Sequence, residues 1–356
     1  MKRLIHMELL VLVVLLIVAV VVSNDQPAPA FSPENLESST GPSVPVSSDP
    51  TVPTTLPTEP SVPTSPGEST APTAATDPVT EPTKLEVTWN TYPPDRELLA
   101  SQYFVYDCKE NQFLISSGQE KTRVYPASIT KLFTAHVAMQ YLEPTTQITA
   151  GDALDLVVWG SSVAKIKKGD VLSVEQLIEA MLLPSGNDAA YMLACQVGRM
   201  IQNNPNLSAR SAYQAFVAEM NTQAAALGMT GTHFTNPDGI HDTNHYTTFG
   251  DLAILGKLAM GNATIMKYAV ITKEQVTLHG ENIEWKNTNK LINPELPYYC
   301  PYAVGLKTGQ TPSAGSCLLS AFRVEGKELL IGVFGCPEED DRFDDTLQLF
   351  NQIVLK

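Results

Sequence analysis

The chain has 356 residues, enough for one or two domains, and a formal net charge of −15 from 23 basic and 38 acidic side chains. It carries no basic cluster, which argues against nucleic acid as a partner and against electrostatic adhesion to anionic lipid. The five cysteines form no Cys-x-x-Cys or Cys/His pattern, so we expect no zinc or other metal site and free, mostly buried thiols.

An apolar segment lies at the N-terminus. Residues 9–22 are uniformly apolar and follow the basic pair Lys2 and Arg3. This length suits the core of a signal peptide, and the apolar residues before it extend the stretch to that of a spanning helix. Residues 1–23 are therefore either an uncleaved membrane anchor, embedded over residues 5–23, or a cleaved signal peptide that releases a secreted protein. In both cases the rest of the chain is exported from the cytoplasm.

A second segment, residues 24–84, has the composition of a spacer. It holds more than half of the chain's 26 prolines, interleaved with Thr, Ser and acidic residues. Such a segment cannot bury enough apolar surface to offset its ordering entropy, so we expect a disordered Pro/Thr/Ser-rich linker. The folded domain is then expected over residues 85–356.

Helices and strands are separated along this domain. Residues 102–108 and 112–116 predict a β-hairpin. Helical patterns follow, with Ser173 and Thr248 as N-caps, over residues 128–141, 174–183, 187–200, 209–227 and 248–260. Strands are predicted over residues 302–308, 316–324 and 328–335, before a closing helix over residues 344–355. This order predicts an α+β fold, with one antiparallel sheet built from both ends of the domain and an inserted all-helical subdomain.

The first of three short motifs is Ser128-Ile129-Thr130-Lys131. Residues three apart on a helix share a face, so the Lys131 amine comes within reach of the Ser128 hydroxyl. A lysine acts as a base near neutral pH only if desolvation or a neighbouring cation lowers its pKa, and Lys307 is a candidate for that cation. The alternative is that Ser128 only caps a helix and Lys131 is a solvated surface residue.

The second motif is Ser185-Gly186-Asn187, preceded by Pro184 and lying between two predicted helices. Pro184 and Gly186 fix a tight loop that aims the Ser185 and Asn187 side chains away from it. In an active site Ser185 would shuttle a proton, and Asn187 would orient the lysine and the substrate. The alternative is an ordinary turn between helices, with Ser185 as N-cap.

The third motif is Lys307-Thr308-Gly309, at the end of a predicted apolar strand. Lys307 and Thr308 can bind an anionic substrate group through charge and a hydroxyl. Gly309 allows close approach of another backbone, so the N–H groups of Gln310 and Ser128 could together form an oxyanion hole. The alternative is a strand that ends and turns through its glycine.

Together, in this order, the three motifs supply a complete set of groups for acyl transfer. The chain resembles the low-molecular-mass penicillin-binding proteins, the D-alanyl-D-alanine carboxypeptidases of serine peptidase family S11. The resemblance covers roughly residues 95–356 and includes the segments 126–131, 183–190, 233–240, 245–248 and 305–309. A β-lactamase usually has Ser-Asp-Asn as its second motif, so the glycine at position 186 favours the peptidase.

The resemblance implies a DD-peptidase/β-lactamase-like fold and a role for each motif residue. It implies Ser128 as acyl-ester nucleophile, Lys131 as proton acceptor, Ser185 and Asn187 as the proton relay, and Lys307, Thr308 and Gln310 as substrate-binding residues. It also places Arg342 where family members support carboxylate recognition, although a local salt bridge with Asp344 or Asp345 is the alternative. The histidines at 233, 241 and 245 match structural positions.

The expected activity is that of a serine-type D-Ala-D-Ala carboxypeptidase, with no cofactor. Its substrate would be the pentapeptide stem of peptidoglycan, and β-lactams would be covalent inhibitors trapped at Ser128. The rival functions are a D,D-endopeptidase or β-lactamase of the same fold, or a non-catalytic module that senses β-lactams or binds the wall. Many relatives continue into a β-rich C-terminal domain with an amphipathic anchor, so here the N-terminal segment is expected to be the tether.

Overall fold

The computed structural model of the protein describes residues 97–354. The predictions for residues 1–23 and 24–84 lie outside the described residues. Every helix within 97–354 is too short or too polar to cross a bilayer.

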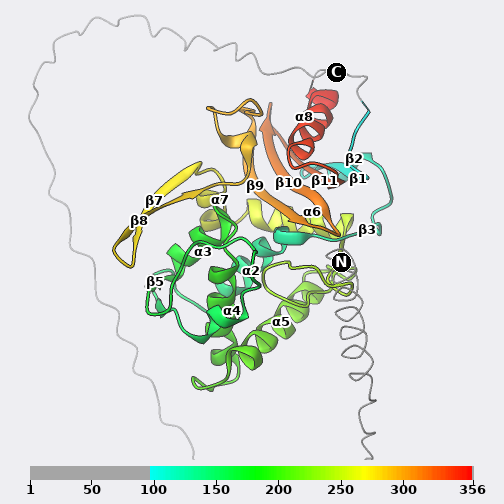
Figure 1. Ribbon diagram of the computed structural model, residues 1–356. Coiled ribbons are helices and arrows are strands. Elements are labelled where there is room, and N and C mark those ends of the chain that lie inside the picture. Colours follow the sequence, from blue (N-terminus) through cyan, green and yellow to red (C-terminus); the bar gives the residue numbers. More distant parts are fainter. Residues whose placement is uncertain (1–96, 355–356) are drawn as a thin grey trace, which may run out of the picture. The chain divides into compact units, whose positions relative to one another are not determined.

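A five-stranded antiparallel sheet, in the order β2-β1-β11-β10-β9, forms the centre of the described domain (Figure 1). Its strands are β1 (Gln102–Asp107), β2 (Gln112–Ser116), β9 (Ala303–Thr311), β10 (Gly315–Val324) and β11 (Lys327–Cys336). Strand β1 pairs with β11, with Val105 opposite Ile331, so the two ends of the domain meet inside one sheet. The predicted sheet built from both ends is confirmed.

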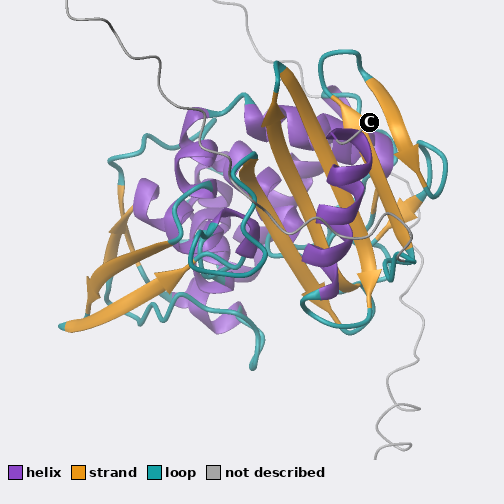
Figure 2. Cartoon of the chain, turned by 90° about the horizontal axis from the view of Figure 1, so that it is seen from above, coloured by secondary structure: helices purple, strands orange, loops and turns teal. Residues whose placement is uncertain are grey.

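Each face of the sheet is covered by helices. Strand residues alternate between two cores because successive side chains point to opposite faces. Leu318 and Phe322 pack on the side of α8 (Asp341–Val354), where the ring of Phe322 stacks on that of Phe350 at 4.5 Å between centroids. Leu319 and Ala321 join the larger core on the other side. Figure 2 shows α8, beside the C-terminus, crossing one face while the other helices lie beyond the strands.

The larger core contains the helices that follow the first motif. These are α2 (Thr130–Ala138), α3 (Val174–Leu182), α4 (Asn187–Ile201), α5 (Ala209–Ala226), α6 (Phe249–Met260) and α7 (Ala263–Ala269). The predicted caps are confirmed: Ser173 forms a capping box with Gln176, and the Thr248 hydroxyl accepts the N–H of Asp251. Helices α4 and α5 touch closely, because a Cβ at Gly198 would lie 1.8 Å from the Ala212 carbonyl oxygen.

Short elements connect these layers. They are β3 (Arg123–Val124), η1 (Ala127–Ile129), β4 (Gln147–Thr149), η2 (Asp152–Leu156), β5 (Val171–Ser173), β6 (Thr247–Thr248), β7 (Lys273–Leu278), β8 (Glu281–Lys286) and η3 (Lys290–Ile292). The hairpin of β7 and β8 was not predicted. It turns through His279 and Gly280, both with positive φ, and its strands are largely exposed, so it lacks the strong apolar alternation of a buried strand.

Two predicted boundaries are wrong near the motifs. The helix expected from residue 128 begins as the 3₁₀ turn η1, becomes α-helical at Thr130 and ends at Ala138. The strand expected over 302–308 continues to Thr311, so the third motif lies inside β9 instead of at its end. Gly309 therefore does not end the strand.

The five cysteines are free and buried, as expected. Cys336 pairs with Ser316 across β10 and β11, while Cys317 lies at an irregularity between Ser316 and Leu318. The two thiols are therefore not directly opposed in the sheet.

Candidate active site

Ser128 and Lys131 are in direct contact, as their spacing predicted. The Lys131 Nζ donates to the Ser128 Oγ over 2.7 Å, from the first turn of α2 to the η1 turn before it. The Lys131 side chain is fully buried, whereas Ser128 is partly exposed. The alternative of a solvated surface lysine is therefore wrong.

A loop over residues 236–240 packs against Lys131 and forms a hydrogen bond with its amine. The Asp238 carbonyl accepts a second hydrogen bond from the Lys131 Nζ over 2.7 Å, and the Pro237 carbonyl accepts the Thr134 hydroxyl over 2.6 Å. Gly239 has φ +84°, and a Cβ there would lie 1.9 Å from the Ala127 carbonyl oxygen. Only glycine fits this close approach. The segment 233–240, which contains this loop, is one of those that resemble the S11 family in sequence. Its backbone contact to Lys131 was not predicted.

Burial sets the electrostatics of this pocket. Desolvation lowers the pKa of Lys131 to about 8, although the nearby carboxyls of Asp238 and Asp188 act in the opposite direction. Desolvation also lowers the pKa of Lys307 well below its usual value, and the charges of Lys131 and Arg342 add to that effect. A neutral amine on Lys131 is thus accessible near neutral pH. Of the two causes considered from the sequence, desolvation lowers the pKa of Lys131, and the Lys307 charge is not among the causes of that shift.

The Ser185-Gly186-Asn187 loop is a strained turn at the start of α4. Ser185 is buried with φ +63°, and Gly186 is the N-cap without a side-chain capping bond, so the alternative of Ser185 as N-cap is wrong. The Asn187 N–H donates to the Ser162 carbonyl over 2.9 Å, while its side-chain Oδ1 is buried without a hydrogen-bond partner in the described part of the chain. A polar group placed in this way is available to a ligand.

Lys307 and Thr308 are joined to this loop by a residue that the sequence patterns did not indicate. The Thr288 hydroxyl lies 2.6 Å from that of Thr308 and 3.4 Å from the Lys307 Nζ, and its N–H donates to the Leu183 carbonyl over 3.2 Å. Thr288 lies in the segment between β8 and η3. No local pattern in the sequence distinguishes it, because its role depends on two distant partners.

Gly309 brings β9 against the serine turn. A Cβ at Gly309 would lie 2.8 Å from the Pro126 carbonyl oxygen and 3.1 Å from the Ser128 nitrogen, so the close approach expected from the sequence is confirmed. The next residue, Gln310, lines the same cavity as Ser128 and Asn187.

Arg342 lies behind this strand. Its Nη1 donates to the Gly309 carbonyl over 3.2 Å, and its Nη2 pairs with Glu339 at 2.9 Å. The alternative role of a local salt bridge is therefore found, but its partner is Glu339 instead of Asp344 or Asp345. The Asp345 carboxylate instead accepts the N–H groups of Leu99 and Ala100, over 2.8 and 2.6 Å.

His245 is a structural residue. Its Nδ1 accepts the Thr235 N–H over 3.1 Å, so its proton lies on Nε2, which faces the Thr130 hydroxyl at 2.8 Å. Burial lowers its pKa to about 3, so the ring is neutral.

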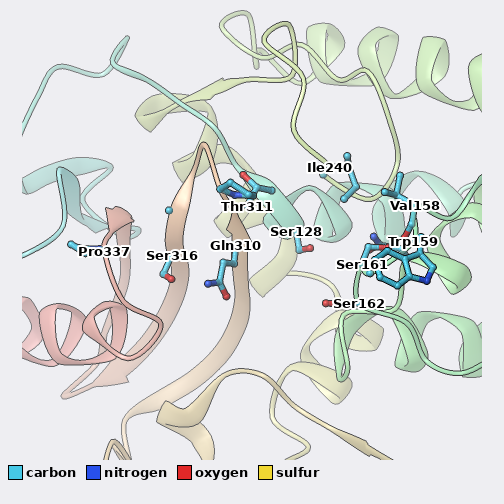
Figure 3. Close-up of a pocket in the computed structure, with 15 residues that line it drawn as sticks. Ser128, Val158, Trp159, Ser161, Ser162, Ile240, Gln310, Thr311, Ser316 and Pro337 are labelled. Carbon is cyan, nitrogen blue, oxygen red and sulfur yellow. Dashed lines mark hydrogen bonds between the residues drawn. The ribbon is translucent and has the colours of Figure 1, made fainter. Parts of the chain in front are cut away.

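A cavity of about 690 Å³ opens above the serine. In Figure 3, Ser128 lies between two walls, with Gln310 and Ser316 on one side and Trp159 and Ile240 on the other. Lys131, Ser185, Lys307 and Thr308 are buried and are not among the residues that line it. Within residues 97–354, no group of three or more His, Cys, Asp or Glu side chains is placed to hold a metal ion.

The family model for the D-alanyl-D-alanine carboxypeptidases, Peptidase_S11, matches residues 88–338. The chain is a member of peptidase family S11. Among curated proteins, this S11 member is similar to the D-alanyl-D-alanine carboxypeptidase of Streptomyces sp. strain K15, at 34% identity over 65% of this chain and 79% of that protein. It is also similar to the carboxypeptidase DacC of Escherichia coli, at 29% identity over 66% of this chain, but it spans only 56% of DacC.

Solved structures of similar proteins support the same family assignment. The Streptomyces K15 DD-transpeptidase superimposes with a TM-score of 0.64 at 29% identity, covering 74% of this chain and 98% of that chain. Penicillin-binding protein D2 of Listeria monocytogenes, in a cefotaxime-bound form, gives a TM-score of 0.59 at 25% identity, covering 73% of this chain and 98% of that chain. The S11 member therefore has the DD-peptidase fold that the sequence predicted.

Proposed function

We propose that this S11 member is a serine-type D-Ala-D-Ala carboxypeptidase that removes the terminal D-alanine from peptidoglycan pentapeptide stems. One observation carries the proposal. A buried lysine amine, with its pKa lowered to about 8, lies 2.7 Å from a partly exposed serine hydroxyl at the floor of an open cavity. This arrangement is a nucleophile with its general base.

Acylation begins when the Ser128 Oγ attacks the carbonyl carbon of the penultimate D-alanine and its proton passes to the neutral Lys131. The oxyanion that forms is stabilised by the N–H groups of Ser128 and Gln310. The C–N bond then breaks, and the leaving D-alanine amine takes the proton through Ser185. Asn187 orients the lysine and the substrate. Water hydrolyses the Ser128 ester and returns the free enzyme.

The terminal carboxylate of the substrate is held by Lys307 and Thr308. Burial disfavours the charged form of Lys307, and a bound carboxylate compensates that charge, so the carboxylate favours a protonated Lys307. Arg342 acts as a positioning residue, since it holds the Gly309 carbonyl on β9.

The activity test is release of D-alanine from a synthetic pentapeptide. The wild-type protein should release D-alanine, and Ser128→Ala should release none and lose labelling by fluorescent penicillin. Ser211→Ala, which changes an exposed serine on α5, is the matched control. Continued labelling of the Ser128→Ala protein would refute the assignment of the nucleophile.

A second candidate is transfer of the acyl group to an amine. The solved structures of the Streptomyces K15 protein name it a DD-transpeptidase, whereas its curated name is that of a carboxypeptidase. Both reactions share the ester on Ser128 and differ in whether water or an amine resolves it. Adding glycine as acceptor separates them, because a transpeptidase forms the glycine-exchanged peptide at the expense of hydrolysis.

Product analysis also distinguishes the endopeptidase, the β-lactamase and the sensing module. Cleavage of a cross-linked dimer indicates an endopeptidase, and rapid turnover of penicillin indicates a β-lactamase. Acylation by penicillin without cleavage of any peptide indicates a sensing module.

We infer further that the enzyme acts on the extracytoplasmic side of the membrane, tethered by residues 1–23 through the linker 24–84. The apolar run and the proline-rich segment of the sequence support this inference. Phase partitioning of the full chain should place it with the membrane, and deletion of residues 1–23 should release it. Equal membrane association of both proteins would contradict the tether.

A further inference from the structure

A tryptophan at the rim of the active-site cavity is almost fully exposed. Trp159 is 98% exposed and its neighbour Val158 is 48% exposed, although both line the cavity above Ser128. Trp285, in contrast, is buried and donates its indole N–H to the Ala164 carbonyl over 2.9 Å. Large aromatic side chains contribute most when they are buried, and exposed apolar groups beside a pocket mark a binding surface.

The loop that carries Trp159 is held by hydrogen bonds close to the tryptophan in the chain. The Ser161 hydroxyl donates to the Val158 carbonyl over 2.6 Å, and Gly160 turns the chain with φ +80°. Further along, the Ser162 carbonyl accepts the Asn187 N–H over 2.9 Å. The tryptophan is therefore held by a turn that is hydrogen-bonded to the second active-site motif.

The cavity beside Trp159 has no charged lining among the described residues. Its lining side chains are Ser, Thr, Asn, Gln, Val, Ile, Trp and Pro, with glycines between them. The two lysines of the site, Lys131 and Lys307, are buried and do not line it. In Figure 3, Val158, Trp159 and Ile240 lie on the side of Ser128 opposite Gln310 and Ser316. This lining suits an uncharged group, and the apolar side chains on the Trp159 side suit an apolar one.

The position of β9 indicates which part of a substrate reaches this wall. Within residues 97–354, β9 is the last strand of its sheet and pairs only with β10, so an extended peptide can lie along its free edge. With the penultimate D-alanine at Ser128 and the terminal carboxylate at Lys307, the preceding residue occupies the remaining cavity. It then lies between the strand residue Gln310 on one side and the loop of Trp159 on the other, where its side chain can contact the tryptophan.

We propose that Trp159, together with Val158 and Ile240, forms a subsite for the apolar part of the side chain that precedes the D-Ala-D-Ala pair. Trp159 is thus a specificity-determining residue, and this inference rests on the proposed function. The ligand class is an uncharged aliphatic or aromatic chain, such as the methylene chain of a diamino acid whose distal amine is acylated.

The test compares two peptides that differ only at this side chain, diacetyl-L-Lys-D-Ala-D-Ala and acetyl-Gly-D-Ala-D-Ala. Trp159→Ala should lower kcat/KM for the lysine peptide by about tenfold, the usual effect of removing an aromatic anchor, and change the glycine peptide by less than about twofold. Trp159→Phe should retain most of the preference. Val171→Ala, which truncates an apolar residue that is 55% exposed on β5 and outside the cavity, is the control and should change neither peptide.

Equal loss on both peptides, or no loss on either, would overturn the subsite. A wild-type protein that cleaves neither peptide would instead refute the carboxypeptidase activity. In that case calorimetric binding of the two peptides to Ser128→Ala decides the subsite separately. Tighter binding of the lysine peptide that is lost on adding Trp159→Ala supports it, and equal binding of both peptides overturns it.

Discussion

Replacing Lys131 with methionine should abolish acylation and also change how stability depends on pH. Lys131 is fully buried, and its pKa falls from the usual 10.5 to about 8. Below pH 8 the amine is protonated in both the folded and the unfolded protein, so the folded state bears the full penalty of the buried charge. That penalty is about 3 kcal/mol, at about 1.4 kcal/mol for each unit of pKa shift.

The sign follows from proton binding. Between pH 8 and 10.5 the unfolded chain binds more protons at this residue than the folded protein, so the free energy of unfolding of the wild type rises with pH. Lys131→Met removes this rise. It also removes the hydrogen bond to the Asp238 carbonyl, a loss of about 1–3 kcal/mol that does not vary with pH.

The measurement is urea unfolding of wild type and variant at pH 7 and pH 9.5. The difference in unfolding free energy, variant minus wild type, should fall by about 2 kcal/mol between these two values. Lys121→Met, which changes an exposed lysine, should give a difference that does not vary with pH. A constant difference for Lys131→Met would refute the idea that burial lowers the pKa of this amine.

Three other outcomes are expected. The rate constant for acylation by a β-lactam should rise with pH and level off above about pH 8, as Lys131 loses its proton. A rate constant that does not change from pH 6 to 9 would argue against a lysine base. Gly309→Ala should lower that acylation rate at least tenfold, because its Cβ would lie 2.8 Å from a backbone carbonyl oxygen. The control Gly151→Ala, whose Cβ would have no atom within 4 Å, should leave the rate unchanged. Equal rates for the two variants would exclude the close approach at Gly309. Thr288→Val should raise KM for the peptide several-fold while Thr288→Ser restores it, and an unchanged KM would show that the hydroxyl bridge to Lys307 has no part in binding.

The parts of the site that the sequence predicted are those set by local geometry. The contact between Ser128 and Lys131 follows from a three-residue spacing, and the caps at Ser173 and Thr248 follow from local hydrogen bonding. The sheet assembled from both ends followed from the order of apolar segments.

The parts that were missed depend on residues far apart in the chain. The Asp238 carbonyl reaches Lys131 across 107 positions, and Thr288 meets Thr308 across 20. The alternative for Arg342 named the wrong partner, because both neighbouring aspartates were plausible from sequence. The fold pairs Arg342 with Glu339 and uses Asp345 to hold the segment at Ala100. The exposure of Trp159 could not be read from composition, because an isolated tryptophan in a sequence usually predicts burial.

The most direct test of the acyl-transfer site is the intact mass of the full chain after incubation with a β-lactam, followed by mapping of the modified peptide. We predict one adduct per chain with the mass of the opened lactam, located on Ser128 and missing from Ser128→Ala. An adduct on another residue, or an unmodified protein that still releases D-alanine in the presence of the drug, would contradict a serine nucleophile at this position.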